Sequence, residues 1–197
     1  MTRRLLTGLA SLAISGALAA GCGGGGTAAP SSTAAAGAAT ASSKFNDADV
    51  TFAQGMIPHH EQAVEMADIA LDPKVKASAT VKDLATRIKA AQAPEIATMT
   101  SWLKGWGKPV TMDAAGHNMS AMDGMMSAAD MKALGAATGP AFDTAFFEMM
   151  IRHHQGAITM AEKVQKDGVN ADVKALAGQV ISAQTAEINE MKKALGK

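Results

Sequence analysis

An internal duplication is the feature that most constrains what this chain can fold into. The sequence MIPHH at 56–60 recurs as MIRHH at 150–154. The residues that match around these stretches are Asp49, Phe52, Ala63, Met66 and Ala67 in the first copy and Asp143, Phe146, Ala157, Met160 and Ala161 in the second. A second matched set follows, pairing Val81, Leu84, Gln92, Glu95, Ile96, Met99 and Leu103 with Val173, Leu176, Gln184, Glu187, Ile188, Met191 and Leu195. The chain therefore contains two copies of one structural unit.

Each copy is predicted to be a pair of helices. Asp-Pro at 72–73 interrupts the first copy and Asp-Gly at 167–168 the second, and such residues commonly end helices. Asp49 and Asp143 are predicted to cap the leading helices, because a carboxylate accepts hydrogen bonds from the free amides of a first turn. On the trailing helices, apolar residues recur at three- and four-residue spacing, which marks one buried stripe on each. A four-helix bundle is the simplest way to bury four such stripes.

The composition agrees with an all-α fold and limits the partners. Tyr is absent, aromatic residues make up 4% of the chain and Met numbers 14, a bias that favours helices over β-sheet cores. Lys plus Arg and Asp plus Glu are equal at 18 each. Because phosphate binding needs a basic face, this balance argues against nucleic acid as a partner.

Two local features complicate the bundle. Pro58 falls inside the first leading helix, and a proline beyond the first turn removes a backbone hydrogen bond, so we expect that helix to start late or to bend. The connection between the copies is longer than a usual loop, and Ser127–Leu134 is able to form a short helix within it. An up-down-up-down arrangement would place both His-His motifs at one end in a shared site. A crossover through the connection would place them at opposite ends as two sites.

Residues 1–21 have the features of an export signal. Arg3 and Arg4 supply a positive start, and residues 5–18 form an apolar stretch too short to span a membrane. The sequence LAAGC that ends at Cys22 resembles a bacterial lipobox. The resemblance implies cleavage before Cys22 and acylation of its thiol, which would anchor the protein to the outer face of the cell membrane or in the periplasm. The alternative is an ordinary secretory signal with an incidental Cys22.

Domain boundaries follow from composition and from the duplication. Residues 22–43 consist almost entirely of Gly, Ala, Ser and Thr, which cannot bury enough apolar surface to fold, so they are predicted to form a flexible tether. The folded domain is assigned to 44–197. It divides into repeat 1 at about 45–104, a Met-rich connection at about 105–140 and repeat 2 at about 141–197.

The duplicated stretches carry the most distinctive chemistry. On a helix, the histidines and methionines of each copy fall within one sector and face the bundle interior. An imidazole binds several transition metals, whereas a thioether helps chiefly with Cu(I), so the mixture selects copper. Di-iron bundles place Glu three residues before His, whereas Met56 and Met150 occupy those positions here. The predicted metal ligands are Met56, His59, His60 and Met66, with Met150, His153, His154 and Met160.

A structural role is the alternative for these residues, because Met packs readily in cores and a buried His can be held by hydrogen bonds. The second copy, and the cost of burying four imidazoles without partners, favour metal binding. Four polar residues recur near the apolar stripes of the trailing helices: Gln92, Glu95, Gln184 and Glu187. They either orient the histidines through hydrogen bonds or cap the polar edge of the bundle.

The connection contains a possible secondary metal site. Its candidate ligands lie close together among Gly, Ser and Asp, and are His117, Met119, Met122, Met125 and Met126. This spacing resembles the Met-rich segments of extracytoplasmic copper carriers, which implies capture and transfer of Cu(I). The alternative is that these methionines fold over the bundle as gap-fillers.

The sequence resembles the bacterial domain-of-unknown-function 305 family. Members share the duplicated pattern Met-Ile-x-His-His-x-x-Ala-x-x-Met-Ala found here at 56–67 and 150–161, and Gln-x-x-Glu-Ile-x-x-Met at 92–99 and 184–191 fits as well. The resemblance covers nearly all of 45–197. It implies a ferritin-like helical bundle, export, and copper binding linked to metal tolerance through the eight ligands given above.

The predicted function is metal binding without catalysis. The protein would be an exported lipoprotein that sequesters copper as Cu(I), confers tolerance, or relays the ion to a copper-delivery or export protein. Copper is the only cofactor expected, and the membrane is a partner through acylated Cys22. One alternative is a copper-dependent oxidase, although no acid, base or nucleophile constellation is evident. Others are a haem-binding bundle, although no Cys-x-x-Cys-His motif exists, and a purely structural or interaction lipoprotein.

Overall fold

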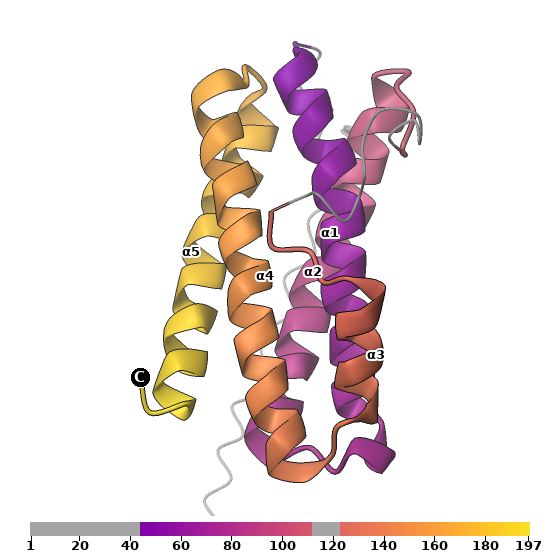
Figure 1. The fold of residues 1–197 in the computed structure, drawn as a ribbon. Coiled ribbons are helices and arrows are strands. Elements are labelled where there is room, and N and C mark those ends of the chain that lie inside the picture. Colours follow the sequence, from indigo (N-terminus) through magenta and orange to yellow (C-terminus); the bar gives the residue numbers. More distant parts are fainter. Residues whose placement is uncertain (1–43, 112–122) are drawn as a thin grey trace, which may run out of the picture. The chain divides into compact units, whose positions relative to one another are not determined.

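The computed structural model describes residues 44–111 and 123–197 (Figure 1). Within these residues the chain is helical and contains no strand, which confirms the predicted all-α bundle. The elements are α1 (Asp47–Leu71), the short 3-10 helix η1 (Pro73–Val75), α2 (Ala79–Gly105), α3 (Ala128–Ala136), α4 (Gly139–Asp167) and α5 (Ala171–Ala194). The leader, the tether and the candidate residues Cys22, His117, Met119 and Met122 lie outside the described residues, so what the sequence indicates for them stays a prediction.

Except for α4, the described α-helices begin at residues whose side chains satisfy free backbone amides. Asn46 precedes α1 in a capping box with Asp49, Ser78 caps α2, and Asn170 caps α5. Such caps stabilise a helix by about 1 kcal/mol each. Both α1 and α4 end at the breaks predicted from the sequence, and α3 occupies the stretch where a short helix was predicted.

Asp49 and Asp143 are not the N-caps of α1 and α4, so that prediction is wrong. The N-caps are Asn46 and Thr138. Asp49 is fully buried and accepts two backbone amides from the turn between α4 and α5, at 3.2 Å each. Asp143 accepts the backbone amide of Ser78, at the start of α2, at 3.0 Å. Each carboxylate therefore stabilises the turn of the other copy, a contact that the residues around each helix start could not indicate.

These two contacts fix the topology. The start of α1 lies beside the end of α4, and the start of α4 lies beside the end of α1, so α1 and α4 are antiparallel. Because each hairpin is also antiparallel, the helix order is up-down-down-up and the connection from α2 to α4 joins opposite ends of the bundle. α1 and α4 pack against each other, α2 packs on α1, and α5 packs on α4 (Figure 1). None of the described helices is long and apolar enough to cross a membrane.

Pro58 lies inside α1, which runs without a break from Asp47, so of the two expected alternatives the late start does not occur. The residues before the proline are anchored in the core, because Phe52, Ala53 and Met56 are all buried. In proteins, such packing contributes more to helix stability than propensity does.

A layer of polar side chains divides the core into two apolar clusters. The first cluster contains Ala63, Met66, Leu84, Ile88, Phe142, Phe146, Met150 and Met191 among its members. The second contains Phe52, Met56, Met99, Leu103, Ala157, Ala161, Val173 and Val180 among its members. Between them on every long helix lie the buried polar residues His59, His60, Gln92, His153, His154 and Gln184, called the polar layer below.

Candidate metal centre

Four buried histidines meet midway along the bundle. His59 and His60 lie near the middle of α1, His153 and His154 near the middle of α4, and all four are 0% exposed. The ring centroids of His59 and His153 are 3.8 Å apart with the planes at 40°, and those of His153 and His154 are 6.3 Å apart. Because both motifs lie at mid-helix, the antiparallel arrangement brings them together. The expectation that a crossover separates them into two sites is therefore wrong.

The outer histidine of each pair is held by a glutamate from the neighbouring helix. His60 Nε2 lies 2.7 Å from Glu95 Oε2, and His154 Nε2 lies 2.7 Å from Glu187 Oε2. An ionised carboxylate only accepts hydrogen bonds, so the hydrogen sits on Nε2, and in a neutral ring the lone pair is then on Nδ1. This is the arrangement by which carboxylates orient metal-binding histidines.

The predicted orienting partners thus divide into two kinds. Glu95 and Glu187 contact histidines, with side chains 21% and 14% exposed at the edge of the polar layer. Gln92 and Gln184 lie within the layer, but the Oε1 atom of each is buried without a hydrogen-bond partner among the described residues. The glutamines add polar groups to the layer and leave their own carbonyl oxygens unpaired.

Most nitrogen atoms of the four imidazoles have no hydrogen-bond partner in the described part of the chain. The unpaired atoms are Nδ1 and Nε2 of His59, Nδ1 of His60, Nδ1 and Nε2 of His153, and Nδ1 of His154. A buried polar group without a partner costs about 1–3 kcal/mol, and such groups are rare in native proteins. A ligand that binds the lone pair of each ring would remove part of that cost.

The two inner histidines are electrically neutral at physiological pH. Burial, reinforced by the neighbouring His60, lowers the pKa of His59 to about 3, against a smaller opposing effect of the Asp123 carbonyl. Burial and the adjacent His59 lower the pKa of His153 well below its ordinary value. A neutral imidazole offers a lone pair without having to lose a proton, which is the state a metal ion requires.

The predicted methionine ligands flank the polar layer on both sides, but not in the pairs that the motifs suggest. Met66 and Met150 belong to the first apolar cluster. Met56 belongs to the second cluster, with partly buried Met160 packed against it. Methionines from different copies therefore share a side of the layer. Met99 and Met191, which sequence reasoning did not select, are also fully buried, one in each cluster.

Residues 49–195 match the family model for a domain of unknown function (DUF305). The chain belongs to the DUF305 family. This match confirms the resemblance inferred from the duplicated motifs. No curated protein matches the chain.

Several solved structures are similar to this DUF305 chain. A DUF305 protein from Streptomyces coelicolor is 31% identical with a TM-score of 0.69, covering 76% of this chain and 92% of that one. A DUF305 fragment from Deinococcus radiodurans is 31% identical with a TM-score of 0.69, covering 77% and 97%. CopM in its Cu(I)-bound form is 32% identical with a TM-score of 0.60, covering 74% and 93%. CopM has also been solved in Cu(II)-bound and Ag-bound forms.

In this DUF305 chain, a non-helical segment, Asp123–Met126, packs against the two central helices beside the histidines. We call it the strap. Gln62 on α1 holds it with two hydrogen bonds, donating to the Met126 carbonyl at 2.9 Å and accepting the Met126 amide at 2.7 Å. On α4 the strap packs so closely against Gly156 that a Cβ there would lie 1.9 Å from the Asp123 carbonyl oxygen. Sequence reasoning missed Gln62 and Gly156, although a signal was available. At this matched position one copy has a long amide side chain and the other has no side chain.

The two methionines of the connection that the structure describes lie at this strap. Met126 is 3% exposed and belongs to the first apolar cluster, and Met125 is half-buried. A guanidinium nitrogen of Arg152 lies 2.8 Å from the Met126 sulfur and 3.5 Å from a carboxylate oxygen of Asp130. Met126 therefore packs over the bundle as a gap-filler, the alternative to an exposed capture loop, while Met125 stays partly accessible.

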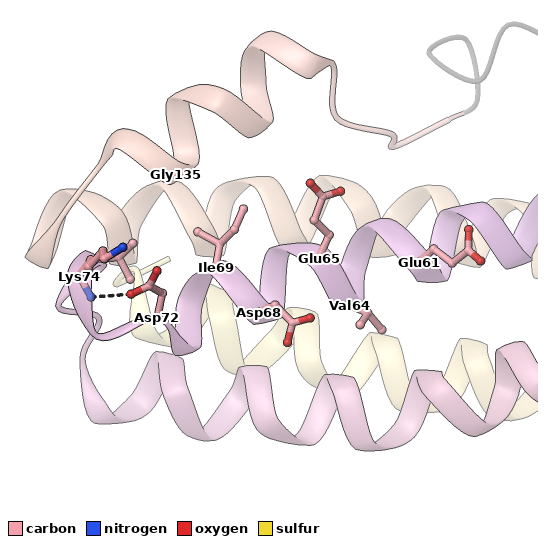
Figure 2. Close-up of a pocket in the computed structure, with 9 residues that line it drawn as sticks. Glu61, Val64, Glu65, Asp68, Ile69, Asp72, Lys74 and Gly135 are labelled. Carbon is pink, nitrogen blue, oxygen red and sulfur yellow. Dashed lines mark hydrogen bonds between the residues drawn. The ribbon is translucent and has the colours of Figure 1, made fainter.

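Carboxylates elsewhere do not form a competing site. Among the described residues, no three His, Cys, Asp or Glu side chains, those of the polar layer included, are already arranged at metal-ligand spacing, so what distinguishes the polar layer is its unpaired imidazole nitrogens. A surface hollow beside α1 is lined by Glu61, Glu65 and Asp68, but Figure 2 shows Glu65 and Asp68 pointing to different sides of the helix. Asp68 is already paired with Lys89. The polar layer is thus the strongest candidate site in the described part of the chain.

Proposed function

We propose that the polar layer binds copper, as Cu(I), and that this protein sequesters or relays the ion outside the cytoplasm. The observation that carries the proposal is the set of buried imidazole nitrogens without partners at the centre of the bundle. CopM, of similar fold and 30–34% identical, has been solved with Cu(I), Cu(II) and Ag bound. That similarity supports copper as the ion to test first.

The donor set suits a soft ion. The proposed ligands are His59, His60, His153 and His154, together with the flanking methionines Met56, Met66, Met150 and Met160. Neutral imidazole and thioether donors favour Cu(I) over hard cations such as Mg²⁺. Hard cations require oxygen ligands, and the carboxylates of Glu95 and Glu187 are engaged with histidines. Both glutamates would orient Nδ1 of their histidines toward the ion.

The proposal involves no catalytic step. A haem held between His59 and His153 does not fit, because rings whose centroids are 3.8 Å apart leave no room for a porphyrin between them. A small ion is the ligand that a narrow space between contacting rings can accept. Export and acylation of Cys22 belong to the proposal as well, and the Streptomyces relative, named a candidate secreted protein, supports export.

The test is an anaerobic Cu(I) titration of the full-length chain against a chromogenic chelator. We expect tight binding that is lost when His59 and His153 are both changed to Leu. The matched control is His117→Ala, which removes the one histidine outside the duplicated motifs and should leave the tight site intact. Equal binding by wild type and the His59/His153 double variant would contradict the proposal.

A further inference from the structure

The polar layer has no open route to solvent through its own side chains, because all four histidines are 0% exposed. An ion that binds there must pass a part of the protein that moves. Helices packed along their whole length open rarely, whereas short segments held by few contacts open most easily. The strap is the non-helical element beside the histidines in the described part of the chain, so its contacts decide how the layer is reached.

The strap lies directly on the backbone that carries His153. A Cβ at Gly124 would lie 2.7 Å from the Arg152 carbonyl oxygen and 2.9 Å from that of His153, and Gly124 has a φ of +82°. Only glycine tolerates both the conformation and the approach. The Asp123 carbonyl lies against Gly156, one turn further along α4. The strap therefore covers α4 from His153 to Gly156.

We propose that the strap is the gate through which the metal ion enters and leaves the polar layer, and that Gln62 is the positioning residue that holds it closed. This inference rests on the proposed function, because it assigns a route to the same site. Gln62 fixes the Met126 backbone from the α1 side, and Gly156 receives the strap on the α4 side. The gate spans the two helices that carry the histidines.

The duplication supports this assignment. Gln62 and Gly156 occupy matching positions of the two copies. One copy supplies a long amide that binds the strap, and the other supplies a residue with no side chain that would obstruct it. Arg152 is a second difference of this kind, because it contacts the Met126 sulfur and matches Pro58 of the first copy. Two of the differences between the copies thus lie where the strap is held.

Few polar contacts hold the strap, which suits a gate better than a permanent wall. They are the two hydrogen bonds to Gln62, the contact between Arg152 and the Met126 sulfur, and the contact of the Asp123 carbonyl with His59. Releasing Gln62 should raise the fraction of time the strap is open by on the order of tenfold, the factor to which the net stabilisation of two hydrogen bonds corresponds. Loop opening of this kind commonly sets the rates of ligand release.

The first experiment measures access to the histidines in the full-length, metal-free chain. Diethyl pyrocarbonate modifies accessible imidazoles, and mass spectrometry gives the rate at each histidine. In Gln62→Ala we expect faster modification of His59 and His153, by about tenfold. The matched control, Gln54→Ala, removes the same amide from α1, where it donates to the Pro109 carbonyl, and should leave the rate unchanged. Equal rates in wild type and Gln62→Ala would overturn the gate.

The second experiment measures release of bound Ag(I) or Cu(I) to a chelator by stopped flow. Gln62→Ala should release the ion faster with unchanged stoichiometry. Gly156→Ala should act in the same direction because its Cβ expels the strap, while Gly178→Ala, whose Cβ meets only Gln165 at 3.3 Å, should not. Release at the wild-type rate in both strap variants would refute the gate. Absence of metal binding by wild type, with modification still accelerated, would refute the proposed function alone.

Discussion

Changing His59 and His153 together to Leu should make the metal-free domain more stable while abolishing its stabilisation by metal. Each of these rings has two buried nitrogen atoms without a partner. At about 1 kcal/mol per unpaired group, the low end of the usual range, the four atoms destabilise the fold by about 4 kcal/mol. Repacking leucine into the layer costs about 1–2 kcal/mol, so a net gain of about 2–3 kcal/mol is expected.

The assay is thermal and urea unfolding of wild type and double variant, each with a strong chelator and with excess Ag(I). For a domain of this size a gain of about 2–3 kcal/mol raises the Tm by about 5–10 °C. Wild type should gain about 2.7 kcal/mol from an ion present at a hundred times its Kd, and the variant should gain nothing. If the variant were less stable than wild type in chelator, the histidines would be structural, and the argument from unpaired nitrogens would be refuted.

Three further predictions test other contacts of the site and fold. Changing Glu95 and Glu187 together to Leu should weaken Cu(I) affinity about 10–100-fold in chelator competition. The corresponding Gln variants should weaken the affinity less, because an amide carbonyl still accepts the Nε2 hydrogen. Equal losses of affinity in the Leu and Gln variants would contradict an orienting role. Acid should lower the free energy of unfolding of the metal-free chain between about pH 6.5 and pH 3. The reason is that His59 is protonated at its ordinary pKa in the unfolded state but only near pH 3 in the folded state. The urea midpoint should therefore fall across that range in wild type and fall less in His59→Leu. Asp49→Ala should lower stability by about 3 kcal/mol or more, because it leaves two amides of the α4–α5 turn without their acceptor. Asp143→Ala leaves only the Ser78 amide without this acceptor and should lower stability less. Comparing the Tm values of the two variants tests this.

The sequence was sufficient to predict the helices, because their signals are local. Apolar spacing, breaks at Asp-Pro and Asp-Gly, and the short helix in the connection all depend on neighbouring residues. The duplication supplied the inward-facing histidines, since residues that match in two copies occupy matching positions in both. Glu95 and Glu187 also recur with the histidines, so a contact between them could be proposed, although their separation along the chain says nothing about distance.

The contacts between copies could not be predicted in the same way. Asp49 bonds to a turn more than a hundred residues away, so a rule about caps assigned it to the nearest helix start. The meeting of His59 and His153 depends on α1 and α4 being antiparallel and equally long on either side of the motifs. The strap depends on Gln62 and Gly156, and neither residue type signals a loop partner by itself.

Duplicating one helical hairpin is enough to build a symmetric centre, because each copy supplies two histidines and one glutamate. Symmetry alone, however, would bury the centre equally from both sides and leave no preferred route for an ion. Two of the departures from symmetry in this chain lie beside the histidines, at Gln62 against Gly156 and at Pro58 against Arg152. Gln62, Gly156 and Arg152 all contact the strap. Restoring symmetry with Gly156→Gln should therefore displace the strap while leaving the helices and the histidine pair in place, which the rate of histidine modification and circular dichroism together would measure.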